Sequence, residues 1–188
     1  MRNIVWFRRD LRISDHPALI AAMEGADEIV PVFILNSVQI ARAGEKLRAY
    51  MSQSLRALDE SLGNRLHVVD GDAVEVLQEL IAKYDVKEVH ISAEYECFGA
   101  ERDARVEAAG IKLVRTGSPY AVAPGRVVKP SDGTPYKVYT PFYKAWCAHG
   151  WRAPAPTPKE IKAPNPIEKY RAFPDFAVPE GTTIIEAG

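Results

Sequence analysis

Hydrophobic and polar positions alternate in a regular order over the first 115 residues of this chain. Short apolar runs rich in Val, Ile and Leu are typical of strands that are covered on both faces. These runs lie at 3–7, 28–34, 65–69, 88–92 and 111–115. Four segments with helical periodicity or helix-start signals separate these runs. The first begins at Pro17, the second runs from Leu47 to Leu62, the third follows the capping residue Asp72, and the fourth spans 101–109 and ends before Gly110.

Five β-α repeats with short connections predict an α/β fold with a parallel sheet, right-handed crossovers and helices on both faces. The usual strand order for such a Rossmann-like sheet is 3-2-1-4-5.

The pattern changes after Arg115. A turn signal at Ser131–Gly133, flanked by short apolar runs, predicts a small hairpin or another ordered excursion. Thr140 is a candidate cap for a short helix that begins at Pro141. Half of the 14 prolines follow Ala153, which predicts an extended connector. We therefore expect an α/β domain over 1–150 and an interdomain linker over 151–188, in a chain that forms the front part of a longer protein.

Composition narrows the function classes. The chain has 188 residues, with Lys+Arg 24 against Asp+Glu 25, so its net charge is -1. A protein that binds nucleic acid by itself normally carries a basic excess. The two cysteines, Cys97 and Cys147, exclude a disulfide scaffold and fit a reducing cytoplasm. No apolar run is long enough to span a bilayer, and no signal peptide is evident.

Ligands of open parallel sheets bind at the carboxyl ends of the strands, where the winding direction reverses. Strand 1 is followed by Arg8–Arg12, and strand 4 by Glu94, Tyr95, Glu96 and Phe98. Charged groups that fix the edges of a ring, with aromatic side chains to cover its face, favour a flat, partly polar heterocycle. Taken alone, the arginine cluster is equally compatible with a solvated loop containing internal ion pairs.

Absent motifs exclude other chemistry. No glycine-rich dinucleotide fingerprint follows strand 1 and no phosphate-binding loop occurs, which argues against a dehydrogenase or a P-loop enzyme. No metal-ligand spacing or catalytic triad is present, so we assign no metal site and no catalytic residue. His67 and His90 lie in strand patterns and are expected to be packed residues.

Two segments resemble a known family. Residues 5–12 (VWFRRDLR) with 15–19 (DHPAL) resemble the amino-terminal signature of the DNA photolyase and cryptochrome family, and residues 133–146 (GTPYKVYTPFYKAW) resemble its second signature. Residues 48–58 and the loop 94–99, followed by Arg102 and Asp103, are similar to intervening family segments. The likeness covers roughly residues 1–150, and the proline-rich tail matches the family's interdomain connector.

The resemblance implies a light-harvesting antenna domain that is not catalytic by itself. It implies a partner, a C-terminal helical domain of the same protein, which holds FAD and repairs cyclobutane dimers in UV-damaged DNA by light-driven electron transfer after base extrusion. A monomer with no membrane association is expected. Carried over by position, the residues lining the antenna pocket are Arg9, Leu35, Asn36, Arg48, Met51, Glu94, Glu96 and Phe98. Asp10 and Tyr136 are expected to face the flavin domain.

Phe98-Gly99 departs from the Asn-Glu of folate-binding members. The resemblance therefore favours a hydroxylated deazaflavin or a flavin over methenyltetrahydrofolate as the antenna, although an empty crevice is also compatible with the family. Two alternatives stay open: a cryptochrome-type photoreceptor domain, and a stand-alone nucleotide-binding module of the universal-stress or electron-transfer-flavoprotein sort. The second leaves residues 133–146 and the tail without a role.

Overall fold

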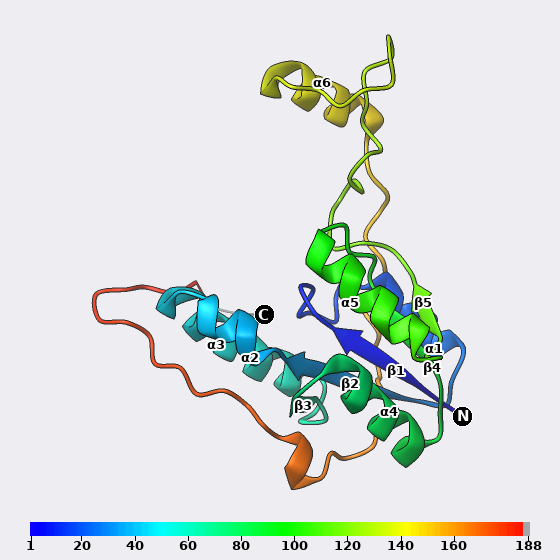
Figure 1. The fold of residues 1–188 in the computed structure, drawn as a ribbon, viewed down its shortest axis with the longest axis vertical. Coiled ribbons are helices and arrows are strands. Elements are labelled where there is room, and N and C mark those ends of the chain that lie inside the picture. Colours follow the sequence, from blue (N-terminus) through cyan, green and yellow to red (C-terminus); the bar gives the residue numbers. More distant parts are fainter. Residues whose placement is uncertain (186–188) are drawn as a thin grey trace.

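A computed structural model describes residues 1–185 and contains one five-stranded parallel sheet in the order β3-β2-β1-β4-β5 (Figure 1). The strands are β1 (Arg2–Phe7), β2 (Glu28–Leu35), β3 (His67–Asp70), β4 (Val86–Ile91) and β5 (Leu113–Arg115). The predicted fold class and strand order are confirmed. Strand ends differ by up to two residues, because β3 and β5 begin only where they pair with β2 and β4.

Helices cover both faces of the sheet. The helices of the described chain are α1 (Pro17–Glu24), α2 (Ser37–Arg42), α3 (Glu45–Ser61), α4 (Ala73–Tyr84), α5 (Cys97–Ala108) and α6 (Tyr139–His149), of which α1, α3, α4 and α5 pack on the sheet. Apolar residues of α1 and α3 pack on one face, around Val5 and Phe7. Those of α4 and α5 pack on the other, around Ile4 and Trp6. The alternation of strand side chains between faces thus produces two separate cores.

Local sequence signals account for several of the helix ends. Pro17 opens α1, Asp72 accepts a hydrogen bond from the Val74 N–H at the start of α4, and Gly110 has a φ of 82° just beyond α5. The start predicted for α5 was wrong, since the helix begins four residues before Glu101. The short helix α2 was not predicted; Asn36 caps it by accepting from the Gln39 N–H.

The segment after β5 leaves the body as an arm, residues 118–151, that carries α6 (Figure 1). A turn forms here, in which the Lys129 N–H donates to the Thr134 carbonyl and the Gly133 N–H donates to the Lys129 carbonyl. No hairpin strands occur in this part of the described chain. Thr140 does not cap α6, which begins one residue earlier with Val138 in the cap position. Pro141 therefore lies in the first turn, where a missing N–H breaks no helical bond.

The proline-rich tail runs extended over the body, apart from one 3₁₀ turn, η1 (Glu168–Tyr170). Its Lys162 carbonyl accepts from the Ile29 N–H, and its Ala172 N–H donates to Val68 O at the outer edge of β3. Tyr170 is only 2% exposed. Arg171 donates two hydrogen bonds of 2.8 Å to the Asp59 carboxylate. The tail is an integral part of the packing around β3 and α3.

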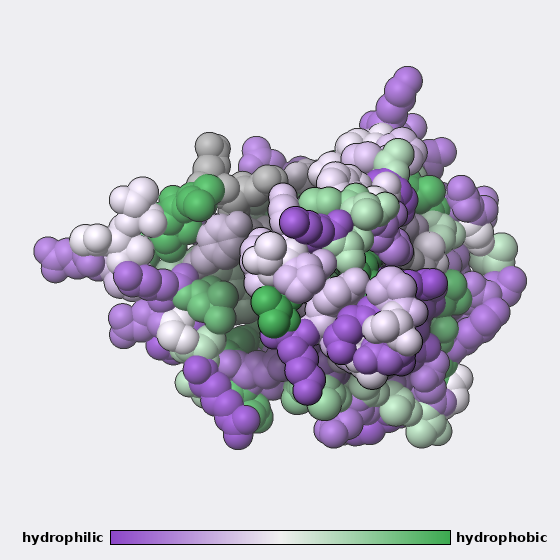
Figure 2. Space-filling view, turned by 90° about the horizontal axis from the view of Figure 1, so that it is seen from above, coloured by the Kyte–Doolittle hydropathy of each residue, from purple (hydrophilic) through white to green (hydrophobic). Residues whose placement is uncertain are grey.

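Seen from the end that carries the arm, apolar and hydrophilic residues are interspersed over the surface (Figure 2). Across residues 1–185, no helix combines the length and the hydropathy that a bilayer-crossing segment requires.

Candidate functional site

The winding direction of the sheet reverses between β1 and β4, which are paired neighbours. The loop after β1 supplies Arg8, the loop after β4 supplies Glu94, and α5 supplies Arg102 and Asp103. These four side chains meet directly over the strand ends. The predicted convergence of arginines and carboxylates at the switch point is therefore observed.

The four side chains form a closed ion-pair cluster. Arg8 lies 2.7 Å from Asp103 and 3.4 Å from Glu94, while Arg102 lies 3.1 Å from Glu94 and 3.0 Å from Asp103. The Arg8 and Asp103 side chains are 5% and 3% exposed. Because buried charges require partners, the four side chains compensate one another's charges over the ends of β1 and β4. The open space lies beside this cluster, toward β2.

Trp6 forms the floor under the cluster. The guanidinium carbons of Arg8 and Arg102 lie 5.2 and 4.6 Å from its ring centroid, within cation–π range. Burial and the neighbouring Arg102 lower the pKa of Arg8, while Glu94 and Asp103 oppose that shift. Arg8, Glu94 and Arg102 of this cluster also line the first of the two cavities described below.

Asp10 is turned inward. Its carboxylate accepts a hydrogen bond from Ser92 Oγ and lies 3.0 Å from His16 Nε2, and Asp10 itself is 4% exposed. Burial alone would raise the pKa of Asp10, but the contacts with His16, Ser92 and the Arg8 N–H hold it well below its usual range. The structure therefore places the Asp10 carboxylate among local partners, and a role of Asp10 toward a second domain stays a prediction.

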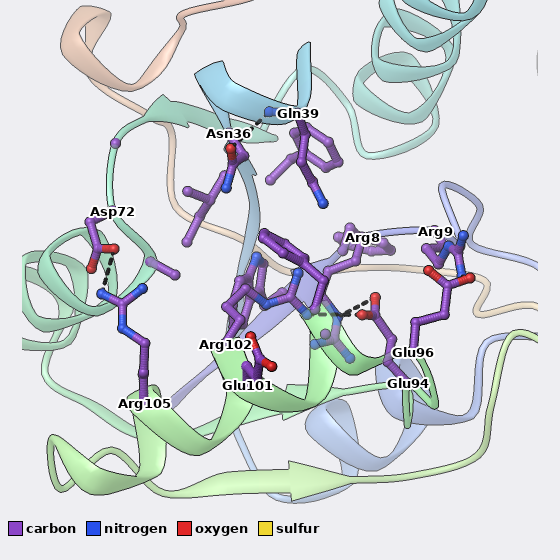
Figure 3. A pocket seen from close by; sticks show the side chains of 18 residues that line it. Arg8, Arg9, Asn36, Gln39, Asp72, Glu94, Glu96, Glu101, Arg102 and Arg105 are labelled. Carbon is purple, nitrogen blue, oxygen red and sulfur yellow. Dashed lines mark hydrogen bonds and ion pairs between the residues drawn. The ribbon is translucent and has the colours of Figure 1, made fainter. Parts of the chain in front are cut away.

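A first cavity of about 380 Å³ opens between the ends of β1 and β2 and the start of α5. Figure 3 shows the amides of Asn36 and Gln39 on one side of it and the Glu94–Arg102 cluster on the other. Arg9 and Glu96 lie at one margin, 2.6 Å apart and 48% and 60% exposed. The hydrogen bond from Arg9 to Glu96 raises the pKa of Arg9.

A second cavity of about 820 Å³ continues from the first toward α2 and α3. The two cavities share Arg9, Asn36 and Phe98, together with Phe33, Ile34 and Gln39. Phe98 is 45% exposed at this junction, where an aromatic ring can cover the face of a planar ligand. The two cavities form one bipartite cleft.

Seven of the eight predicted pocket residues line this cleft: Arg9, Asn36 and Phe98 line both cavities, Glu94 and Glu96 the first, and Arg48 and Met51 the second. Leu35 lines neither cavity, because its side chain points into the core beneath α3. Tyr136 stands on the arm, half-buried against Phe142, with its ring centroid 6.3 Å away. Its role toward a second domain stays a prediction.

Sequence reasoning missed Trp6, Gln39 and Arg102 as cleft residues, although a helical pattern from Ser37 could have suggested Gln39. It also missed the role of Gly99. A Cβ at Gly99 would lie 2.1 Å from Glu94 Oε2, so the bare helix surface is what lets Glu94 approach Arg102.

Comparison with known proteins supports this architecture. Residues 3–161 match the DNA photolyase family. A deoxyribodipyrimidine photo-lyase from Streptomyces griseus is 33% identical over 175 residues, covering 87% of this chain and 38% of the relative.

Solved structures agree with the sequence relatives. A bacterial class III photolyase from Agrobacterium tumefaciens superposes with a TM-score of 0.76 at 31% identity, covering 92% of this chain and 37% of that one. An archaeal photolyase from Sulfolobus tokodaii, described with two FAD molecules and the implication of a novel light-harvesting cofactor, gives 0.73 at 26% identity, covering 87% and 39%. This chain thus spans less than half the length of each relative. It belongs to the DNA photolyase family and corresponds to the N-terminal α/β part of its members.

Proposed function

We propose that the bipartite cleft binds a planar light-absorbing chromophore, a flavin or a hydroxylated deazaflavin. The observation that carries this proposal is the convergence of Arg9, Asn36, Glu96 and Phe98 around one cleft from the ends of β1 and β2 and the start of α5. Amide and carboxylate groups suit the polar edge of a heterocycle, and Phe98 suits its face. A flavin is the class of cofactor named for the Sulfolobus relative, which supports the same class here.

The chemistry of the donor set fits such a ring. Asn36 and Gln39 offer both donors and acceptors, and Glu96 offers an acceptor whose only charged partner within residues 1–185 is Arg9. When bound, the chromophore would absorb light and pass the excitation on. The protein binds the ring, fixes its orientation and excludes water from one face.

Titration of the purified chain with riboflavin tests this function, with bound ligand followed by fluorescence and absorption. We expect saturable one-to-one binding, and about tenfold weaker binding in Glu96→Ala, because a lost charge-assisted hydrogen bond costs about 1.5 kcal/mol. Glu107→Ala is the matched control, since Glu107 also pairs with an arginine, Arg115, but lies outside the cleft. Equal affinities of wild type and Glu96→Ala would contradict the assignment of Glu96.

We further propose that residues 1–150 act as the antenna domain and 151–188 as the linker to an FAD-binding helical domain. In the complete protein, energy from the antenna would drive flavin-dependent repair of cyclobutane pyrimidine dimers. The arm supports the proposal of a partner domain, because no residue of α6 is buried and Tyr139 and Tyr143 are 72% and 49% exposed. A large exposed aromatic surface is typical of a docking site.

Damaged DNA would be bound only through the complete protein, and the chain would be a monomer. A light-dependent repair assay on a dimer-containing oligonucleotide tests whether repair requires the helical domain. We expect no repair by residues 1–188 and repair by a longer form that includes a helical domain. Repair by the 188-residue chain alone would overturn it.

A further inference from the structure

Two limbs connect the arm to the α/β body, one before α6 and one after it (Figure 1). No residue of α6 is buried, and within residues 1–185 no hydrogen bond or ion pair joins 121–151 to the body. The direction in which the arm leaves the body is therefore set by the contacts at its base, where the two limbs begin and end.

The outgoing limb is packed against the start of α1. Gly117 has a φ of 71° and lies so close to Pro17 that a Cβ added at Gly117 would come within 2.8 Å of the proline ring. The Gly117 carbonyl accepts a hydrogen bond of 3.0 Å from the Ala93 N–H, just after β4. Beyond this point, the Tyr120 hydroxyl accepts only a longer hydrogen bond, of 3.3 Å, from the exposed side chain of Arg9. The outgoing limb is thus fixed mainly at Gly117.

Asp15, two residues before Pro17, binds the returning limb. Its Oδ1 accepts a hydrogen bond of 2.8 Å from the Ala155 N–H, across 140 residues of sequence, and lies 2.6 Å from the Arg152 guanidinium. The Ala155 N–H and Arg152 hold the pKa of Asp15 below its usual value, although desolvation opposes this shift. Both contacts are charge-assisted hydrogen bonds, which are stronger than neutral ones.

The backbone of Asp15 is strained. Its φ of 46° lies in the left-handed region, which few residues other than glycine adopt and which aspartate tolerates better than most. Apart from a longer contact with Arg12 at 3.9 Å, its carboxylate pairs, in the described chain, only with the returning limb. A strained residue persists where surrounding contacts maintain it, and such residues are often functional.

We propose that Asp15, with its partners Arg152 and Ala155, is a latch that fixes the angle of the arm on the α/β body. The segment 15–17 then attaches both limbs, because Gly117 packs on Pro17, and two separate attachment points prevent pivoting about either one. The latch deepens the proposed function and rests on it for its purpose, which is to position α6 for docking on the helical domain.

The only two cysteines of the chain report the angle of the arm. Cys97 lies on α5 in the body, Cys147 lies on α6 in the arm, and both are exposed. Nitroxide labels on both cysteines give the distribution of distances between arm and body by pulsed electron paramagnetic resonance. We expect a narrow distribution in wild type and one at least about twofold wider in Asp15→Gly, because the returning limb is released. Glycine accepts the left-handed backbone, so this change removes the carboxylate without adding strain.

Asp85→Gly is the matched control. Asp85 is also left-handed, with a φ of 52°, but it is exposed at the end of α4. This variant should keep the wild-type width. Arg152→Gln removes one of the two partners of Asp15 and should give an intermediate width. Because Arg152 is an exposed residue outside the sheet, broadening in Arg152→Gln does not come from unfolding of the body.

A wild-type width in Asp15→Gly, or equal broadening in Asp85→Gly, would overturn the latch, as would a broad distribution in wild type itself. The measurement is made on the 188-residue chain, so these outcomes depend on neither a chromophore nor a helical domain. Conversely, if riboflavin failed to bind, or a helical domain failed to protect α6 from proteolysis, the proposed function would be overturned and the latch would stand.

Discussion

His16 Nε2 and the Asp10 carboxylate lie 3.0 Å apart beneath the first loop, and both residues are almost fully buried. His16 Nδ1 accepts a hydrogen bond from the Leu19 N–H at 3.1 Å, so Nδ1 carries no proton and Nε2, which faces Asp10, carries one. The same imidazole thus caps α1 and orients Asp10 toward Ser92. This pair ties the loop after β1 to the start of α1.

Asp10→Asn should lower the free energy of unfolding by about 2–3 kcal/mol, because hydrogen bonds to a buried charged group are lost. Urea denaturation measures this as a lower midpoint with an unchanged slope. Asp27→Asn, which removes an exposed carboxylate paired with the amino terminus, is the control and should leave the midpoint almost unchanged. Equal midpoints for the two variants would contradict the role of Asp10.

The burial of the His67 imidazole predicts that the free energy of unfolding depends on pH. Burial lowers the pKa of His67 to about 4, and its ring bonds to Tyr84 Oη at 2.9 Å. Between the ordinary value of about 6.5 and the folded value, the unfolded state binds more protons than the folded state. Stability should therefore be complete above pH 6.5 and fall by about 3 kcal/mol as the pH drops to 4.

Denaturation curves at several pH values, compared between wild type and His67→Gln, isolate this contribution. The variant should show a weaker loss of stability between pH 6.5 and 4, because its side chain does not titrate. His149→Gln, on the exposed surface of the arm, should retain the wild-type pH dependence. Parallel pH profiles for wild type and His67→Gln would contradict the assignment.

Gly99→Ala should disturb the ion-pair cluster although it removes none of the charged side chains. The added Cβ would meet Glu94 Oε2, which is held by Arg102, so we expect a loss of about 1–3 kcal/mol from overpacking. Ala100→Ser, on the exposed side of the same helix, is the control. Thermal unfolding distinguishes the two, and an unchanged midpoint for Gly99→Ala would show that Glu94 can move away freely.

Tyr170→Ala should destabilise the α/β body although Tyr170 lies in the proline-rich tail. Its ring is buried among His67 and Tyr84, so truncation should cost about 3–4 kcal/mol. Ile167→Ala, 45% exposed in the same segment, should cost far less. If hydrogen exchange showed β3 equally protected in Tyr170→Ala and wild type, the tail would not be part of the core.

Chymotrypsin should cut the arm first. Tyr139, Tyr143 and Trp151 are 72%, 49% and 59% exposed, whereas Trp6 and Phe7 are buried in β1. We expect early cleavage within or beside α6 and persistence of the fragment that contains the sheet. In a longer form with a helical domain, the same sites should be protected. Equal cleavage rates in the two forms would contradict docking through the arm.

The sequence was sufficient to predict the sheet, because continuous apolar strands and short connections allow few topologies. It was also sufficient to predict that Arg9, Asn36 and Glu96 lie together at the carboxyl ends of the strands. It could not show that Arg8, Glu94 and Asp103 neutralise one another, since that depends on side-chain geometry across three segments. The strand pattern alone therefore could not predict that the open cleft lies on the β2 side of this cluster, although the resemblance named seven residues that line it.

Two other features depended on tertiary contacts. The resemblance placed Leu35 in the pocket, but a single step along a strand moves a side chain to the opposite face, and Leu35 packs in the core. The docking of the tail was also unpredictable, since prolines indicate an extended backbone and say nothing of what Tyr170 and Arg171 bind.

The contact between Arg171 and Val68 has a consequence for self-association. The unpaired edge strand of a sheet is a template on which another chain can add a strand. Here the tail lies along the β3 edge, where the Ala172 N–H donates a hydrogen bond to the Val68 carbonyl. The opposite edge strand, β5, has only three residues. Each molecule thus covers this edge with its own tail, and loss of that cover would expose the β3 edge to intermolecular β-pairing and aggregation.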